Sequence, residues 1–233
     1  MLNTLWILVG LLALTCLVAA AEEEPAEEPG ETPKEELVRF DRLWDYRKPD
    51  ETEKRFRELL PRAERSGNLD YHLQLLTQIA RAEGLQGLFD DAHATLDQVE
   101  AKLAEANAAT RMRYLLERGR AFNSSKNRRK EARALFLEAW EYGVKHGVDY
   151  DALDDAHMLE IVEHQEEKLA WSEKAMKLAE RSEDPNCKLW LGTLYNNRGW
   201  GLFYLGRYED AMALHAKCRA WHEERGNVEP ALI

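Results

Sequence analysis

Three residues near the middle of the chain have the types and spacing of a possible metal site: His157, Glu160 and His164. On one helix, steps of three and four residues place side chains along the same face, so two imidazoles and a carboxylate could share one metal ion. The alternative is that these are groove-lining or solvated polar residues, since Glu163 crowds the pattern without completing a known one. We favour this alternative and predict no metal and no cofactor, with metal-dependent activity as a minor alternative.

The cysteines could also carry chemistry. Cys16 lies in the amino-terminal apolar segment, whereas Cys187 and Cys218 lie 31 positions apart in the remainder. They could form a disulfide outside the cytoplasm, or pack as small hydrophobic side chains.

The chain has no glycine-rich phosphate loop, no nucleophile elbow and no paired-histidine zinc-protease motif. We therefore predict a protein that is not an enzyme and has no catalytic residues.

The amino terminus reads as a targeting segment. Residues 5–21 contain no charge, and three alanines before Glu22 offer a small-residue cleavage pattern. We predict a signal peptide over residues 1–21 and a mature protein that is extracytoplasmic, either periplasmic or secreted. The apolar run is near the lower limit of a membrane span, so an uncleaved amino-terminal membrane anchor is the alternative.

The net charge of -11 is concentrated behind this segment. Residues 22–36 hold eight Glu and one Lys, a net charge of -7, which leaves -11 - (-7) = -4 for the rest. With three prolines and little to bury, residues 22–35 are expected to form an acidic flexible linker. No basic surface is indicated, so we expect no nucleic-acid partner.

From Glu35 onward the pattern is helical, with apolar residues at steps of three and four and almost no strand signal. Short breaks containing Gly, Asn or Pro separate segments of mostly 12 to 22 residues. The pattern also repeats along the chain. Small or apolar residues recur at matching offsets from two reference points, and less closely from three others; the five lie 40, 39, 37 and 43 residues apart. These reference points are Phe40, Ala80, Gly119, Ala156 and Gly199.

This pattern resembles the tetratricopeptide repeat in its longer form of about 40 residues. The resemblance covers residues 36–226, and it is carried best by the repeats around Ala80 and Gly199. The stretches "RYLLERGRAFNSS", "DDAHMLEIVE" and "LYNNRGWGLFYLGRYEDAMALHAK" are also similar to an uncharacterised bacterial protein family that contains this repeat. The resemblance implies an all-α fold: a right-handed α-solenoid of about five antiparallel helix hairpins.

In such a repeat two helices, A and B, pack face to face. Small residues are expected where they approach most closely, and Leu202, Tyr208 and His215 would fill the space between layers. Gly206 would permit the tight reversal between the helices. The predicted packing positions are Ala80, Ala92, Gly119, Ala132, Ala156, Ala175, Gly199 and Ala211.

The resemblance also implies that the A helices line a concave groove that binds a protein or peptide segment. The residues predicted to face it are Arg81, Arg113, Arg120, His157, Asn196, Trp200 and Phe203. The three arginines would receive an acidic segment or a carboxyl terminus, and the two aromatic side chains would supply apolar contact. The alternative is that the arginines form ion pairs with neighbouring helices, for example with Glu83 or Glu117. If they bind the partner, replacing all three with alanine should abolish binding while melting stays nearly unchanged.

The carboxyl terminus suggests a second hypothesis. After Gly226 and Asn227 the segment "VEPALI" resembles the truncated start of a further A helix, over residues 227–233. A solenoid normally ends with a polar capping helix, and Ala231, Leu232 and Ile233 are not polar. The favoured function is an extracytoplasmic interaction scaffold that binds an unidentified protein in its groove. The alternative is a structural subunit that self-associates through this uncapped end, which would make the protein a homo-oligomer.

Overall fold

The computed structural model describes residues 37–125 and 128–226. The predicted signal peptide (1–21), the predicted linker (22–35) and residues 227–233, including Ala231, Leu232 and Ile233, lie outside the described residues. Within the described ranges the fold is entirely helical, with no strand, which confirms the all-α prediction. None of the described helices is long and apolar enough to cross a membrane.

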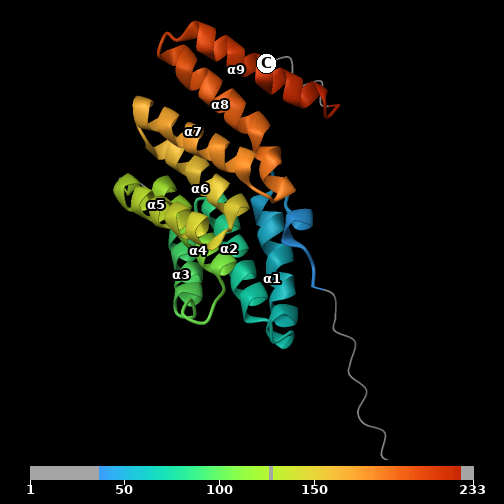
Figure 1. Ribbon diagram of the computed structural model, residues 1–233. Helices are drawn as coiled ribbons and strands as arrows, with labels where there is room; N and C mark the ends of the chain where they lie inside the picture. The colour runs from blue at the N-terminus through green and yellow to red at the C-terminus, as the bar shows by residue number, and fades with distance from the viewer. Residues whose placement is uncertain (1–36, 126–127, 227–233) are drawn as a thin grey trace, which may run out of the picture. The chain divides into compact units, whose positions relative to one another are not determined.

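Nine α-helices follow one another along the described chain, together with two short 3-10 helices. The α-helices are α1 (Pro49–Arg65), α2 (Leu69–Leu85), α3 (Phe89–Glu100), α4 (Ala108–Ser124), α5 (Arg129–His146), α6 (Asp149–Val162), α7 (Gln165–Arg181), α8 (Leu191–Tyr204) and α9 (Tyr208–Glu223). The 3-10 helices are η1 (Phe40–Leu43) and η2 (Pro185–Trp190). Each α-helix packs against the next one, which is the arrangement of an α-solenoid (Figure 1).

Four A–B hairpins are complete in the described residues: α2–α3, α4–α5, α6–α7 and α8–α9. The first repeat differs from the expectation, because the four-residue η1 stands where its A helix was predicted and α1 is its B helix. Helical backbone is disfavoured at the residue before a proline, and Pro49 is the first residue of α1, where a proline is well tolerated. Phe40 and Trp44 still pack against buried Phe56, with ring centroids 6.3 and 5.3 Å away, and so occupy the place of the missing helix.

The hairpin turns follow the glycines that the repeat predicts. Gly87 and Gly206 occupy equivalent positions and have φ values of 80° and 74°, in the left-handed region that only glycine adopts readily. The amide of the next residue donates to a carbonyl five residues earlier in both turns, from Leu88 and from Arg207, at 3.0 Å. This is the glycine-terminated helix end expected for a tight reversal.

All eight predicted packing positions are buried. Two of these positions are equivalent glycines with close neighbours: a Cβ added to Gly119 would lie 2.4 Å from the Phe136 ring, and one added to Gly199 would lie 2.8 Å from the His215 ring. Small residues are therefore needed here because a large side chain from the partner helix fills the space. Tyr208 is the exception to the predicted interlayer packing: its side chain is 57% exposed at the start of α9.

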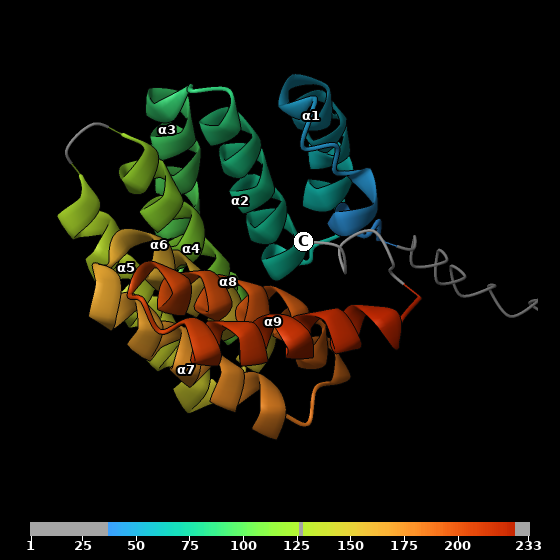
Figure 2. The ribbon, with the colours of Figure 1, turned by 90° about the horizontal axis from the view of Figure 1, so that it is seen from above.

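One joint of the array differs from the others. The A helices α2 and α4 pack directly together, as do α4 and α6, whereas η2 is inserted before α8 and contacts α6, α7 and α8. Beyond η2, α8 and α9 lie side by side in both views (Figures 1 and 2). With α7 they share a small apolar cluster of four buried residues, Leu169, Leu202, Ala211 and Leu214.

The two cysteines of the helical region are buried. Cys187 lies in η2, and Cys218 in α9 donates its thiol hydrogen to the carbonyl oxygen of Gly192 at 3.4 Å. Within the described residues both are free thiols, which matches the alternative in which they pack as small apolar side chains.

Candidate functional site

A groove of about 660 Å³ runs along three A helices, α2, α4 and α6. The segment that contains η1 borders it on one side and η2 borders it on the other. Its charged lining residues are Arg39, Arg81, Arg113, Glu117, Arg120, Asp151, Asp154 and Asp184. The three predicted arginines therefore lie in one groove, with carboxylates between them.

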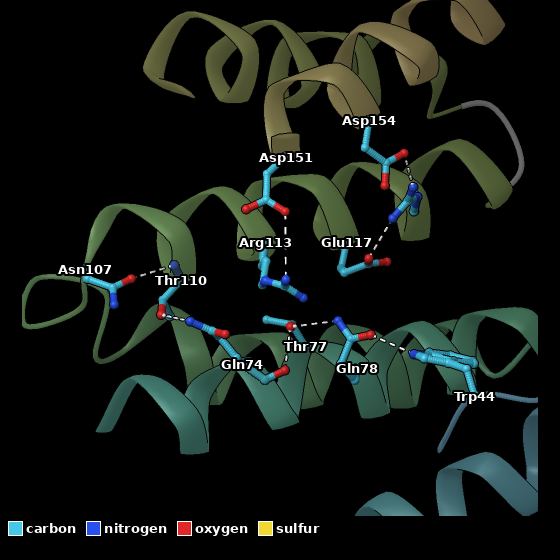
Figure 3. Close-up of polar contacts among 11 residues, drawn as sticks. Trp44, Gln74, Thr77, Gln78, Asn107, Thr110, Arg113, Glu117, Asp151 and Asp154 are labelled. Carbon is cyan, nitrogen blue, oxygen red and sulfur yellow. Dashed lines mark hydrogen bonds and ion pairs between the residues drawn. The ribbon is translucent and has the colours of Figure 1, made fainter. Parts of the chain in front are cut away.

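Glu117 of α4 lies at the centre of these charges. One carboxylate oxygen, Oε1, lies 2.7 Å from a guanidinium nitrogen of Arg120. The other, Oε2, lies 3.4 Å from a guanidinium nitrogen of Arg81. Arg120 also reaches Asp154 of α6 at 2.6 Å. In Figure 3, Glu117 and Asp154 lie on neighbouring helices, and a dashed line joins each of them to the side chain between them. Arg81 and Arg120 thus hold adjacent A helices together, as the ion-pair alternative expected.

Arg113 is different. Its closest acidic partner is Asp151, with a guanidinium nitrogen 3.8 Å from a carboxylate oxygen, which is too long for a hydrogen bond (Figure 3). Its Nε is buried and has no hydrogen-bond partner among the described residues. The Arg113 side chain is also the most exposed of the three, at 32%. It is therefore the groove arginine with donors left for a ligand.

The carboxylates of α6 are unequally compensated. Burial raises the pKa of Asp151 above its ordinary value, and the distant Arg113 offsets this only in part. Burial acts on Asp154 in the same direction, but the close guanidinium of Arg120 lowers the pKa of Asp154 below its usual range. Asp151 is therefore the less fully neutralised of the two carboxylates.

Aromatic side chains border the groove beside Arg81. Trp44 and Tyr46 stack with ring centroids 4.7 Å apart, and the Arg81 guanidinium carbon lies 6.0 and 5.7 Å from these two centroids. The Trp44 indole nitrogen donates to Gln78 at 2.9 Å, which fixes its orientation (Figure 3). Tyr150 borders the groove on α6 and is 43% exposed.

The other predicted groove residues lie elsewhere. His157 and Trp200 line a second pocket, between α6 and α8, in which Asn197 replaces the predicted Asn196 as the lining asparagine. Phe203 is 45% exposed and packs edge-on against Trp200, with centroids 5.6 Å apart. The structure thus divides the predicted set between two sites.

The idea of a single helix face carrying His157, Glu160 and His164 is wrong. The helix that contains the first two residues, α6, ends at Val162, and His164 precedes the first residue of α7. Among the described residues, no group of three His, Cys, Asp or Glu side chains is arranged to hold a metal ion. Glu160 instead accepts a hydrogen bond from Asn197.

Asp155 of α6 is fully buried, and neither of its carboxylate oxygens has a hydrogen-bond partner within residues 37–125 and 128–226. Burial, reinforced by Asp154, raises its pKa well above the ordinary value. The folded protein therefore retains a proton that the unfolded chain releases above about pH 4. The free energy of unfolding falls as pH rises from there to the raised pKa of Asp155.

We expect Asp155→Asn to remove this penalty. In urea unfolding, the variant should be more stable than the native protein by about 1–3 kcal/mol at pH 7 and equal to it below about pH 4. The exposed Asp210→Asn serves as the control and should change stability little at either pH. A constant difference between the native protein and Asp155→Asn from pH 4 to pH 8 would contradict the assignment.

Sequence reasoning missed the carboxylates of the groove. Asp151, Asp154 and Asp155 lie in the acidic stretch "DYDALDD", and the first two are three residues apart on one helix. That clustering was the available signal. Arg113 and Arg120, the partners of Asp151 and Asp154, lie 38 and 34 residues earlier in the sequence. Which side chains meet across that separation depends on how successive helices pack.

No family model matches this chain, and no curated protein matches it. Solved structures do match. One, from Pyrococcus horikoshii, is a Signal Transduction ATPase with Numerous Domains (STAND) protein with a tetratricopeptide repeat sensor; it aligns with a TM-score of 0.60 and 15% identity. That alignment covers 80% of this chain and only 30% of the STAND protein. BtubC (BKLC) from P. vanneervenii aligns with a TM-score of 0.57 and 11% identity, over 84% of this chain and 87% of that one.

At these identities the similarity shows the fold alone. Together with the hairpins and their turns, it supports a tetratricopeptide-like helical repeat, as the sequence pattern indicated.

Proposed function

We propose that this protein is a non-enzymatic interaction scaffold that binds a protein segment in the groove formed by α2, α4 and α6. The observation that carries the proposal is Arg113: a partly exposed guanidinium on the groove wall, whose closest acidic partner, Asp151, lies 3.8 Å away. A carboxylate from a partner can accept two parallel hydrogen bonds from such a group. The stacked Trp44 and Tyr46 offer apolar contact in the same groove.

We also propose that the protein acts outside the cytoplasm. The support is in the sequence: residues 5–21 are uncharged and end in three alanines before Glu22. An uncleaved segment would instead keep the protein anchored to the membrane by its amino terminus.

A photo-crosslinking amino acid at Tyr150, in the groove, tests both proposals in intact host cells. We expect a crosslinked partner from this position and none from Glu141, an exposed position on the B helix α5. Arg113→Gln should abolish the crosslink at unchanged melting temperature. Mass spectrometry of the recovered protein should also find Glu22 as its first residue. Equal crosslinking from Glu141, or full capture by Arg113→Gln, would reject the groove as the binding site.

Self-association is a second candidate, favoured by a specific observation. Three large apolar side chains at the α8–α9 end are strongly exposed: Tyr204 at 72%, Tyr208 at 57% and Met212 at 73%. Such a surface is typical of an interface. The same crosslinker placed at Met212 would recover a second copy of this chain if the protein self-associates there, and sedimentation would show a mass that rises with concentration.

A further inference from the structure

A second pocket, of about 440 Å³, lies where α8 meets α6. Its lining includes His157, Glu160, Lys168, Asn197, Trp200 and Tyr204. It lies at the joint where η2 is inserted before α8, and there η2 contacts α6, α7 and α8. The pocket shares no lining residue with the groove.

Glu160 forms the floor of this pocket. Its side chain is only 2% exposed, and one oxygen, Oε2, accepts a hydrogen bond from Asn197 at 3.2 Å and lies 3.6 Å from Nδ1 of His157. The other oxygen, Oε1, is buried and has no hydrogen-bond partner within the described part of the chain. A buried carboxylate oxygen costs free energy unless it accepts a hydrogen bond. A donor that binds in this pocket would therefore be stabilised, and a cationic donor most of all.

The walls favour a cation carried on an apolar stem. Trp200 and Tyr204 are 38% and 72% exposed, with ring centroids 6.1 Å apart, and aromatic faces attract cations. Ile161 adds an apolar contact and is 47% exposed. Lysine and arginine side chains combine these two properties, since each has an aliphatic stem and a cationic end.

The remaining charges in the pocket leave Glu160 as the open anion. Glu163 also lines it, but its carboxylate accepts a hydrogen bond from Arg133 at 2.7 Å. Lys168 also lines the pocket, and its positive charge competes with an incoming cation for Glu160. His157 is linked to Asn197 at 3.2 Å and approaches only Oε2 of Glu160.

We propose that this pocket receives the cationic end of a lysine or arginine side chain from a partner protein, with Glu160 as its counter-ion and Trp200 and Tyr204 as its walls. The protein source of that side chain rests on the proposed scaffold function. The two sites are close enough to bind one segment of a partner. The Trp190 ring of η2 lies 6.3 Å from the Tyr150 ring in the groove and 6.0 Å from the His157 ring in the pocket, between centroids.

The test uses the peptide N-acetyl-Gly-Lys-Gly-amide, its arginine counterpart, and a norleucine version that keeps the stem without the charge. Binding is followed by NMR of the full helical protein through the indole resonance of Trp200. We expect millimolar affinity for the two cationic peptides and no saturable shift with norleucine. Glu160→Gln should weaken cation binding at least about tenfold, and Lys168→Gln should strengthen it, because a competing cation is removed.

Three results would overturn the proposal: a norleucine peptide that binds as well, a Glu160→Gln variant that binds as tightly as the native protein, or a glutamate peptide that binds better than the lysine peptide. If Glu160→Gln does not fold, Tyr204→Leu, at a position that is 72% exposed, replaces it and should also weaken binding. Arg113→Gln separates the two proposals, since it should abolish capture in the groove and leave lysine-peptide binding unchanged.

Discussion

Replacing Arg120 with methionine is expected to destabilise the protein by about 3 kcal/mol or more. The Arg120 side chain is only 17% exposed and connects Glu117 of its own helix with Asp154 of the next A helix. Methionine fills similar space but leaves two largely buried carboxylates close together with less positive charge between them. Removing one partner from a buried ionic network costs far more than the network itself contributes.

The pH dependence gives this prediction a specific signature. Arg120 lowers the pKa of Asp154, so the pair contributes stability above the ordinary pKa of an aspartate and loses it as pH falls through the lowered value. The difference between native and Arg120→Met should therefore be larger at pH 7 than at pH 3 in urea unfolding. Adding Asp154→Asn should recover part of the loss.

Arg207→Met is the matched control. Its ion pair with Asp210 has a similar separation of 2.7 Å, but both side chains are 55% exposed. Exposed pairs contribute about 0–1 kcal/mol, so this variant should melt close to the native protein. If Arg120→Met melts as Arg207→Met does, the network is not structural. A large loss would also mean that replacing all three groove arginines tests folding as well as binding, whereas Arg113→Gln tests binding alone.

Two glycine-to-alanine substitutions are expected to act in opposite directions. At Gly119 the new methyl group would lie 2.4 Å from the ring of fully buried Phe136, which has no free space to move into. The cost of overpacking, about 1–3 kcal/mol, should exceed the helix-propensity gain of up to about 1 kcal/mol, for a net loss of up to about 2 kcal/mol. At Gly84, in α2, no atom lies within 4 Å of the added Cβ, so only the gain remains.

A double-mutant cycle with Phe136→Leu identifies the clash as the cause. Leucine should cost less in the Gly119→Ala background than in the native protein, because the smaller side chain relieves the overlap. Urea unfolding of the four proteins measures the coupling. Additive losses, or a Gly119→Ala variant that is stabilised as Gly84→Ala is, would show that the contact is not tight.

The sequence predicted local packing well because the repeat determines it. Gly119 and Phe136 lie 17 residues apart and Gly199 and His215 lie 16 apart, so hairpin geometry alone brings each pair together. The same reasoning placed Gly206 in a tight reversal, and Gly87 occupies the equivalent position. In these cases the residue type and the spacing predict the same contact, because two helices joined by a short turn can pack in few alternative registers.

Contacts between hairpins were less predictable. Whether Arg120 meets solvent or Asp154 depends on the rotation between successive A helices, which residue spacing does not specify. The insertion of η2 is a clearer example. The sequence indicated only a break at residues 184–186, yet η2 lies there, and Trp200 lines a pocket separate from the arginine groove. Tyr208 was predicted as interlayer packing, but none of the described residues forms a further hairpin that would cover it.

The η2 insertion also affects how the array unfolds. In a linear repeat, stability is the sum of each unit's own stability and its interfaces with its neighbours. The α8–α9 hairpin has one neighbouring hairpin in the described chain. It shares a cluster of four buried apolar residues with α7, and Leu194 of α8 joins it to the larger core. Its amides should therefore exchange with solvent through partial opening, while the helices from α2 to α6 open only when the whole array does. Binding a partner across the pocket at Glu160 would join this hairpin to the rest and make the last hairpin part of one cooperative unit.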